Sequence, residues 1–211
     1  MNNFARIIGL GIVVLLVAAC SSTTMSGSWS DPAFKGQVKN VYIIGIAKNE
    51  TTRRIFEDAF SGHLGTSGVR TVSSYKDLPN SEEATREDII KGMTDEGCDS
   101  VLLTKLVGQR QETVTTPGRV SGYSSGPYYG NRGGYYNNWG SYYGRRHEVI
   151  YEPPTSTEFT ILTVESVLYD LQTEKMIWSG QLETVVEQNI EKNIQDFVIE
   201  VSKDMADKGI I

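Results

Sequence analysis

The pattern of apolar and polar positions predicts five β-strands. The run from Val38 to Ile46 is almost continuously apolar and rich in β-branched residues, as expected for a strand buried on both faces. Alternation over Val69–Tyr75 predicts a second strand, and Asp99–Thr115 begins as a buried strand before polar residues alternate with apolar ones. Two further β-rich runs, Ser156–Gln172 and Met176–Val186, flank three polar residues and predict a hairpin.

Apolar residues at helical spacing predict three helices. The first follows the opening strand, with Asn49 or Thr51 as its N-cap and Gly65 or Gly68 at its end. A short second helix runs over residues 85–96, and the clearest one over residues 189–208. Their inward faces carry Ile55, Phe56, Ala59, Phe60 and Leu64 in the first, Ile89, Ile90 and Met93 in the second, and Ile190, Ile194, Phe197, Val198, Val201 and Met205 in the third.

The order β-α-β-α-β-β-β-α predicts the fold class, a single α/β (α+β) domain with a mixed five-stranded sheet. Strands joined by helices run parallel with right-handed crossovers, whereas strands joined by turns run antiparallel. Numbered along the chain, the predicted strands lie in the order 2-1-3-4-5, with the helices packed on the sheet. Residues 37–211 form this domain, which about 190 mature residues suffice to build around one core.

The N-terminal segment has the layout of a lipoprotein signal peptide. Arg6 precedes an apolar run that is shorter than the roughly 20 residues of a membrane-spanning helix, and small residues close it. The end of the run, Leu16–Val17–Ala18–Ala19–Cys20, resembles a bacterial lipobox. The resemblance implies that residues 1–19 are removed and that Cys20 receives a diacylglycerol and a further acyl chain such as palmitate.

Lipidation at Cys20 makes the membrane the first predicted partner. Two or more acyl chains hold a protein stably on a bilayer, whereas one chain binds marginally. Ser21 stands where aspartate would signal retention at the inner membrane, so the lipobox resemblance favours the inner leaflet of an outer membrane, facing the periplasm. Residues 20–36, rich in Ser, Thr and Gly, are expected to be a flexible tether, although Trp29 and Phe34 within it could pack on the domain.

Charge and cysteine content narrow the functional class. The formal net charge is −6, and signal-peptide cleavage removes Arg6 without removing any acid. An exported acidic chain without a basic face in its folded part is a poor nucleic-acid binder, so no nucleic-acid partner is predicted. With Cys20 lipidated, Cys98 has no intramolecular partner, and its place before an apolar run predicts a buried structural thiol.

Residues 116–148 are predicted to be a long insertion at the tip of a hairpin. The segment 116–147 contains eight glycines, seven tyrosines, four arginines and no acidic residue. Such a segment cannot bury enough surface to order itself, so it is either a tolerated disordered insertion or an adhesive surface for a glycan, an anionic headgroup or a protein. The candidate contact residues are Tyr128, Tyr129, Tyr135, Tyr136, Trp139, Tyr142, Tyr143, Arg145 and Arg146.

No motif in the chain predicts catalysis, a cofactor or a metal site. His63 and His147 lack metal-ligand spacing, and neither a Cys-x-x-Cys pair nor a Gly-x-Ser-x-Gly elbow is present. Glu57 and Asp58 are expected to face solvent from the outer side of the first helix, and Glu165 to mark a sheet edge. The prediction is therefore that the protein is not an enzyme.

Several segments resemble a widespread class of small bacterial lipoproteins. They are the lipobox, "WSDPAFKG", "VYIIGI", "RRIFEDAF", "SSYKDLP", "GCDSVLLTKLV" and "LYDLQTEKMIWSG". The last segment is also similar to a strand-turn-strand phrase of the curli-secretion lipoproteins, the penicillin-binding-protein activators and the N-terminal domain of the Tol-Pal propeller protein. The resemblance implies an α/β sandwich in the cell envelope and no catalytic residue, and Glu174 stands where those families have a glycine.

In that phrase, Asp170 and Thr173 are expected to hydrogen-bond the turn backbone, while Trp178 packs on the sheet and Gly180 relieves a crowded or bulged position.

These observations predict a non-enzymatic cell-envelope lipoprotein that binds or assembles an envelope partner. The first alternative is a module that binds peptidoglycan or lipopolysaccharide through the Tyr/Gly/Arg insertion. The second is an envelope hydrolase whose site has no recognisable motif. The predicted partners are the membrane, through the N-terminal lipid, and an envelope protein or a glycan. The sequence does not identify the partner or the oligomeric state.

Overall fold

The computed structural model describes residues 22–124 and 147–211, which divide into two compact units. The first unit, ending at Arg110 and resuming at Thr160, is a mixed α/β fold with an open six-stranded sheet in the order β1-β8-β7-β4-β2-β3. The strands are β1 (Thr23–Ser30), β2 (Asn40–Ile46), β3 (Arg70–Ser73), β4 (Ser100–Thr116), β7 (Thr155–Asp170) and β8 (Met176–Val185). Its helices are α2 (Glu50–Thr66), the 3-10 turn η2 (Ser74–Lys76), α3 (Arg86–Asp95) and α5 (Ile190–Asp207).

The predicted strand order is confirmed, and the strand count is corrected from five to six. Strand β2 pairs in parallel with β3 and β4, and β7 pairs antiparallel with β8, as the connection lengths require. The additional strand is β1, which pairs antiparallel with β8. Residues 23–30 lie within the predicted flexible tether, but backbone hydrogen bonds to β8 place them in the sheet regardless of their Ser/Thr/Gly composition.

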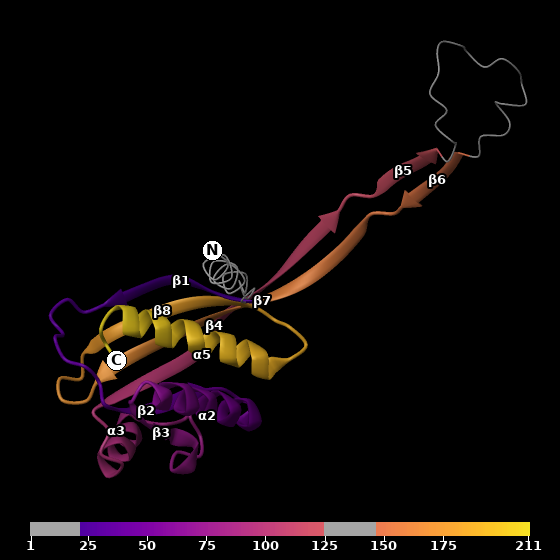
Figure 1. The fold of residues 1–211 in the computed structure, drawn as a ribbon. Coiled ribbons are helices and arrows are strands. Elements are labelled where there is room, and N and C mark those ends of the chain that lie inside the picture. The colour runs from indigo at the N-terminus through magenta and orange to yellow at the C-terminus, as the bar shows by residue number, and fades with distance from the viewer. Residues whose placement is uncertain (1–21, 125–146) are drawn as a thin grey trace, which may run out of the picture. The chain divides into compact units, whose positions relative to one another are not determined.

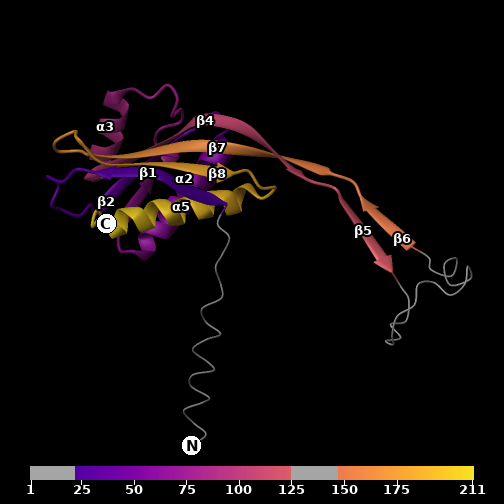
Figure 2. The same cartoon turned by 90° about the horizontal axis from the view of Figure 1, so that it is seen from above.

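The helices cover the two faces of the sheet unequally. Helices α2 and α5 lie on one face, and α3 lies on the opposite face (Figures 1 and 2). The cluster under α2 and α5 is the larger, and a second cluster around Tyr42, Ile44 and Val101 lies under α3. The outer face of β1 and β8 therefore carries polar side chains and the half-exposed Trp29.

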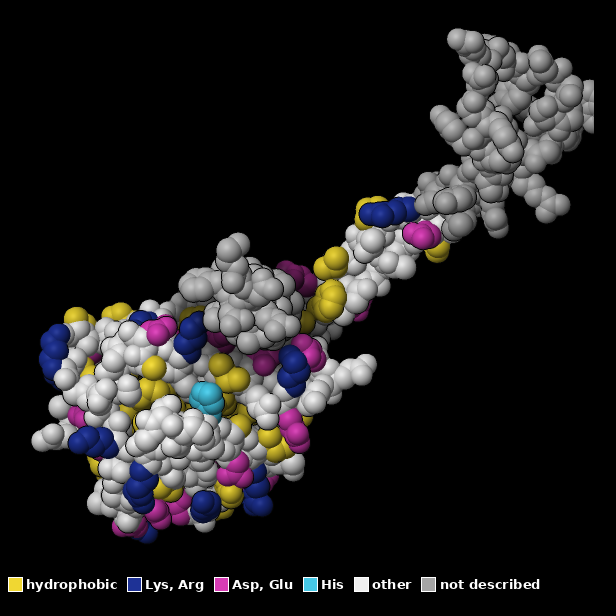
Figure 3. Space-filling view, in the orientation of Figure 1, with side chains coloured by type: hydrophobic (Ala, Val, Ile, Leu, Met, Phe, Trp, Pro, Cys, Tyr) yellow, Lys and Arg dark blue, Asp and Glu magenta, His cyan; other side chains and the backbone are white. Residues whose placement is uncertain are grey.

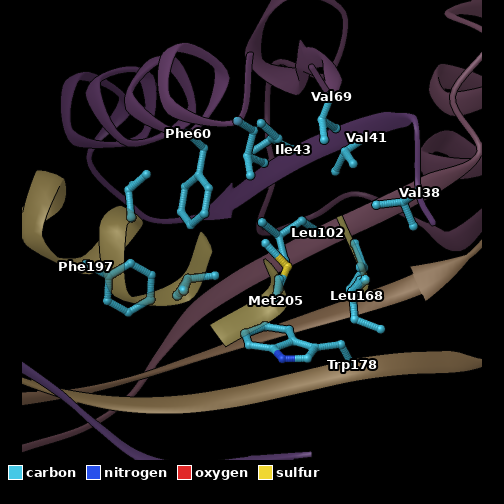
Figure 4. Close-up of a cluster of buried hydrophobic side chains, with 14 of the residues drawn as sticks. Val38, Val41, Ile43, Phe60, Val69, Leu102, Leu168, Trp178, Phe197 and Met205 are labelled. Atoms are coloured by element: carbon cyan, nitrogen blue, oxygen red, sulfur yellow. The ribbon is translucent and has the colours of Figure 1, made fainter. Parts of the chain in front are cut away.

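Aromatic contacts connect the two helices of the larger cluster. The ring centroids of Phe56 and Phe60 on α2 lie 4.9 Å apart, and both rings contact Phe197 of α5. In Figure 4, Phe60 and Phe197 lie on the same side of Leu102, and Trp178 lies below them over the strands of the sheet. Trp178 is fully buried, and a Cβ at Gly180 would lie 2.6 Å from its ring, so the predicted crowding at Gly180 is confirmed.

The predicted helix starts are confirmed by their caps. Asn49 and Asn189 accept hydrogen bonds from backbone N–H groups in the first turns of α2 and α5. At α3, Thr85 and Asp88 form a reciprocal capping box. The strand predicted over residues 69–75 ends at Ser73, because the backbone turns into η2 there.

The β7–β8 turn forms as predicted, with a left-handed residue at its tip. Asp170 accepts hydrogen bonds from the backbone N–H and the hydroxyl of Thr173, at 2.8 and 2.6 Å. Glu174 has φ of 54°, the one positive φ among the non-glycine residues that the structure describes. Its carboxylate pairs with Arg86 on α3, which explains how a residue other than glycine is held in this strained position.

Substitutions at Glu174 separate the backbone strain from the ion pair. Both Glu174→Ala and Glu174→Gly remove the contact with Arg86, but only glycine relieves the left-handed strain. We expect Glu174→Gly to be about 1 kcal/mol more stable than Glu174→Ala in urea unfolding. Equal stability of the two variants would show that the turn relaxes when the carboxylate is lost.

Strand β1 is tied to α5 by two carboxylates. Asp196 accepts hydrogen bonds from the backbone N–H and hydroxyl of Ser22 and pairs with Lys192. Asp204 accepts hydrogen bonds from the Trp178 indole at 2.8 Å and from the Ser28 hydroxyl at 2.9 Å. Burial raises the pKa of each carboxyl, but these hydrogen bonds and the paired lysines outweigh it, so that both pKa values are lowered.

This attachment is expected to weaken in acid. A carboxyl whose pKa is lower in the folded chain stabilises the fold above its unfolded pKa of about 3.9, and the contribution is lost as pH falls through the folded value. Asp204→Asn should therefore lower the free energy of unfolding at pH 7. The difference from the parent protein should become smaller below about pH 4, as measured by urea unfolding at each pH. Asp207→Asn, on the exposed side of α5, is the matched control. A deficit independent of pH would contradict the assignment.

Candidate functional site

The predicted site residues lie outside the described part of the chain. These are Cys20 and the nine Tyr, Trp and Arg residues of the insertion, while His147 is described only as part of a strand. The structure instead defines the two places to which these residues are attached. Ser22, two positions after Cys20, is fixed on the first unit, and strands β5 and β6 flank residues 125–146.

The second unit, Gln111–Phe159, is a two-stranded antiparallel ribbon. Strands β4 and β7 continue into it, and beyond them β5 (Arg119–Ser124) pairs with β6 (His147–Glu152), with Ser124 opposite His147. Prolines at 117, 153 and 154 interrupt both strands at one level, since proline cannot donate to a β ladder. Gly118 is required there, because a Cβ would lie 2.6 Å from the carbonyl oxygen of Glu152.

Side chains in the ribbon are exposed wherever the structure describes their environment. Residues 111–119 and 151–159 are all exposed, including the large apolar side chains of Val114, Tyr151 and Phe159. The pair β5–β6 forms a sheet of its own, so each of these strands has one edge without a partner in the described chain. An isolated two-stranded ribbon is only marginally stable in water.

The insertion predicted over residues 116–148 begins and ends in paired strands, since β5 pairs with β6.

A buried polar cluster lies at the carboxyl end of β2. Glu57, expected on the solvent side of α2, is fully buried, whereas its neighbour Asp58 is exposed as predicted. Arg53 is also buried and donates to Glu57 at 2.9 Å. The position of Glu57 was missed because it follows Phe56 on a helix whose buried side is wide enough to include both.

Every part of this ion pair has hydrogen-bond partners. The Arg53 guanidinium donates to the hydroxyl of Ser74 and to the carbonyl oxygens of Leu78 and Pro79. The Glu57 carboxylate accepts from the backbone N–H groups of Gly45 and Tyr75 and from the Ser74 hydroxyl. The cluster therefore connects β2, α2 and η2, and it explains why the second predicted strand ends at Ser73.

Removal of one member should leave an uncompensated charge in the interior. Arg53→Ala is expected to lower the free energy of unfolding by about 3–5 kcal/mol, because Glu57 then stays buried without its cation. The adjacent Arg54 is 58% exposed, and Arg54→Ala should change stability by less than about 0.5 kcal/mol. Urea unfolding of both variants measures the difference, and a small loss for Arg53→Ala would show that the cluster contributes little.

Two further titratable groups of the first unit, Tyr42 and Cys98, have structural roles. The Tyr42 hydroxyl donates to both oxygens of Asp77 at 2.9 Å, and burial together with this bond raises the pKa of Tyr42. Burial raises the pKa of the Cys98 thiol to about 11, consistent with the predicted structural thiol. No group of three or more His, Cys, Asp or Glu side chains within residues 22–124 and 147–211 is placed to hold a metal ion.

An apolar cavity of about 260 Å³ lies between the sheet and the first turns of α2 and α5. Gly45 and Ile46 at the end of β2, Thr104 of β4 and Val164 of β7 are among the residues that line it. The predicted core residues Phe56, Ile194 and Phe197 form part of its helical wall. The sequence placed these residues in the core, but a cavity depends on how completely the side chains fill the space between elements, which periodicity does not reveal.

Charged side chains show no single-sign patch on the face of the first unit in Figure 3, where acidic and basic groups are interspersed. Cross-strand ion pairs in the first unit include Lys105 with Glu165 and Arg110 with Glu183. Glu165, expected at a sheet edge, therefore lies on an inner strand and is paired. No helix in the described part of the chain is long and apolar enough to span a membrane.

Comparisons with known proteins indicate only distant similarity. No protein-family model matches the sequence, and no curated protein does. Similar solved structures include two of the PelC dodecamer from Paraburkholderia phytofirmans, with TM-scores of 0.46 and 0.44, 10% identity, and 85% of this chain and 94% of the other covered. Another is the lipoprotein GNA1162 from Neisseria meningitidis, with a TM-score of 0.42, 12% identity, and 80% and 99% covered. All three TM-scores lie below 0.5, so no function or assembly is carried over from them.

Proposed function

We propose that the protein is a non-enzymatic lipoprotein of the cell envelope, anchored at Cys20, that binds an envelope partner through its second unit. The observation that carries this proposal is the exposure of the ribbon. All side chains of residues 111–119 and 151–159 are exposed to solvent. A chain segment that forms regular strands yet buries none of its side chains has surface available for another molecule.

The ribbon offers two kinds of contact. Its unpaired strand edges can accept a further strand through backbone hydrogen bonds, which supply affinity with little dependence on sequence. Its exposed Val114, Tyr151 and Phe159 can supply apolar contacts that select the partner. The Tyr/Gly/Arg residues between β5 and β6 add side chains suited to interfaces, since tyrosine has a large contact area and arginine recognises planar anionic groups.

The buried charged pair of the first unit is not placed for acid–base catalysis. The most buried charged groups of this unit, Arg53 and Glu57, form hydrogen bonds with one another and with the surrounding backbone. A general acid or base needs access to a substrate proton, which this pair lacks. In this proposal the first unit is the folded body to which the lipid is attached, and Ser22, two positions after Cys20, is bound to Asp196 of α5.

Two nested variants test the proposal. Ser124 lies opposite His147, so an Asn-Gly turn can replace residues 125–146 and leave β5 and β6 intact. Thr115 and Ser156 share a cross-strand hydrogen bond, so the same turn between Thr116 and Thr155 removes the outer ribbon entirely. We expect that the second variant no longer crosslinks to its partner proteins in intact cells. The first variant should lose the same crosslinks if the Tyr/Gly/Arg segment makes the contacts.

Membrane fractionation and thermal unfolding provide the controls, because both variants should remain anchored and folded. Unchanged crosslinked partners in both variants would exclude the second unit as the contact. The glycan alternative predicts a different outcome. The variants would no longer co-sediment with isolated peptidoglycan, while their crosslinked protein partners would stay the same. The mass of the purified protein tests the lipid at Cys20 independently of either result.

A further inference from the structure

The apolar cavity in the first unit has the properties of a site for a narrow hydrocarbon chain. Its walls are contributed by side chains such as Phe56, Leu162, Val164, Ile194 and Phe197, which offer no hydrogen-bonding group. At about 260 Å³ it is smaller than the roughly 300–1,000 Å³ pockets that hold drug-sized ligands. Its small volume and apolar lining therefore suit part of a hydrocarbon chain better than a polar ligand.

The mouth of the cavity is apolar and open to the surface. Leu106 and Ile190 both line it, and they are 53% and 51% exposed. The neighbouring charged groups are engaged elsewhere, since Lys105 pairs with Glu165 and Arg53 with Glu57. Among the described residues, the charged groups that line the cavity are therefore already paired, which favours an uncharged hydrocarbon chain as the occupant.

The described chain begins beside this cavity. The Ser22 hydroxyl accepts a hydrogen bond from Asn193, a residue of the cavity wall, at 3.2 Å. The next residue, Thr23, is buried and its hydroxyl lies 2.9 Å from that of Thr184, which also lines the cavity. Cys20 precedes Ser22 by two residues, which span at most about 7 Å, so an acyl chain attached there would need to cross only a short distance to reach this wall.

We propose that the cavity holds one acyl chain of the lipid attached at Cys20 while the protein is away from a bilayer. This inference rests on the lipidation in the proposed function. Each methylene group moved from water into apolar surroundings gains about 0.8 kcal/mol, so an acyl chain exposed to water would be strongly drawn to an adjacent cavity. A bilayer buries the whole chain, whereas the cavity covers part of it, and contact with a membrane releases the chain.

A semisynthetic chain at Cys20 tests this proposal without cellular lipidation. The chain from Cys20 to Ile211 is produced without its apolar N-terminal segment and alkylated with N-dodecylmaleimide or, as the control, N-ethylmaleimide. Cys98 is buried with a raised pKa and is not alkylated in the folded protein. The dodecyl form should unfold at a temperature higher by at least about 2–4 °C, a measurable shift for a chain of this size.

Two substitutions on β7 locate the bound chain. Val164 lines the cavity and pairs with Leu182, whereas Val167 pairs with Ser179 on the opposite face of the sheet. Val164→Phe should abolish the difference between dodecyl and ethyl forms, and Val167→Phe should preserve it. Ala47→Phe, at the cavity rim, replaces Val164→Phe if that variant does not fold.

Three results would overturn the proposal. They are equal unfolding temperatures of the dodecyl and ethyl forms, a dodecyl effect that persists when the cavity is filled, and a dodecyl effect that appears only with self-association in light scattering. Failure of the lipidation itself is distinguished by the mass of the protein purified from cells, because the alkylation experiment does not depend on it.

Discussion

The buried pair of Arg53 and Glu57 is the interaction on which the first unit depends most. Burying two charges is costly unless each is paired and hydrogen-bonded, and here the surrounding backbone satisfies both. Because the partners come from the end of β2, the first turns of α2 and the segment after β3, the cluster sets how α2 lies on the sheet. That position creates both the aromatic contact with α5 and the cavity between the two helices.

Helix α5 has a second role in holding the N-terminal part of the chain. Two of its carboxylates bind side chains of β1 or its neighbours, and the strand completes one edge of the sheet beside β8. A lipid at Cys20 would therefore be connected to the folded body by a very short segment. With the proposed lipid in place, so short a segment would restrict where the first unit can lie relative to a membrane surface.

The two units differ in how they are stabilised. The first unit has two apolar clusters and a network of buried polar bonds, whereas the second is stabilised in the described chain mainly by its β ladder. Under the proposed function, the second unit would gain further stability from the partner that it binds. The prolines and Gly118 at the junction of β4 with β5 limit how far the continuous ladder extends.

The sequence by itself determined the elements whose side chains alternate or repeat with a clear period. Strands β2, β4, β7 and β8, helices α2, α3 and α5, and the sheet order follow from apolar patterning and from connection lengths, since these fix which faces are buried and which strands can be neighbours. The β7–β8 turn was equally predictable, because Asp170, Thr173 and Gly180 act within a few residues of their own positions.

Only the tertiary structure decided the features that depend on distant partners. Strand β1 has the composition of a linker and becomes a strand because β8 presents an unpaired edge. Glu57 reads as a solvent-facing acid and is buried because Arg53, Gly45 and Tyr75 satisfy it. The cavity and the exposed ribbon likewise follow from packing between separated elements, and local periodicity carries no information on how well such elements fit together.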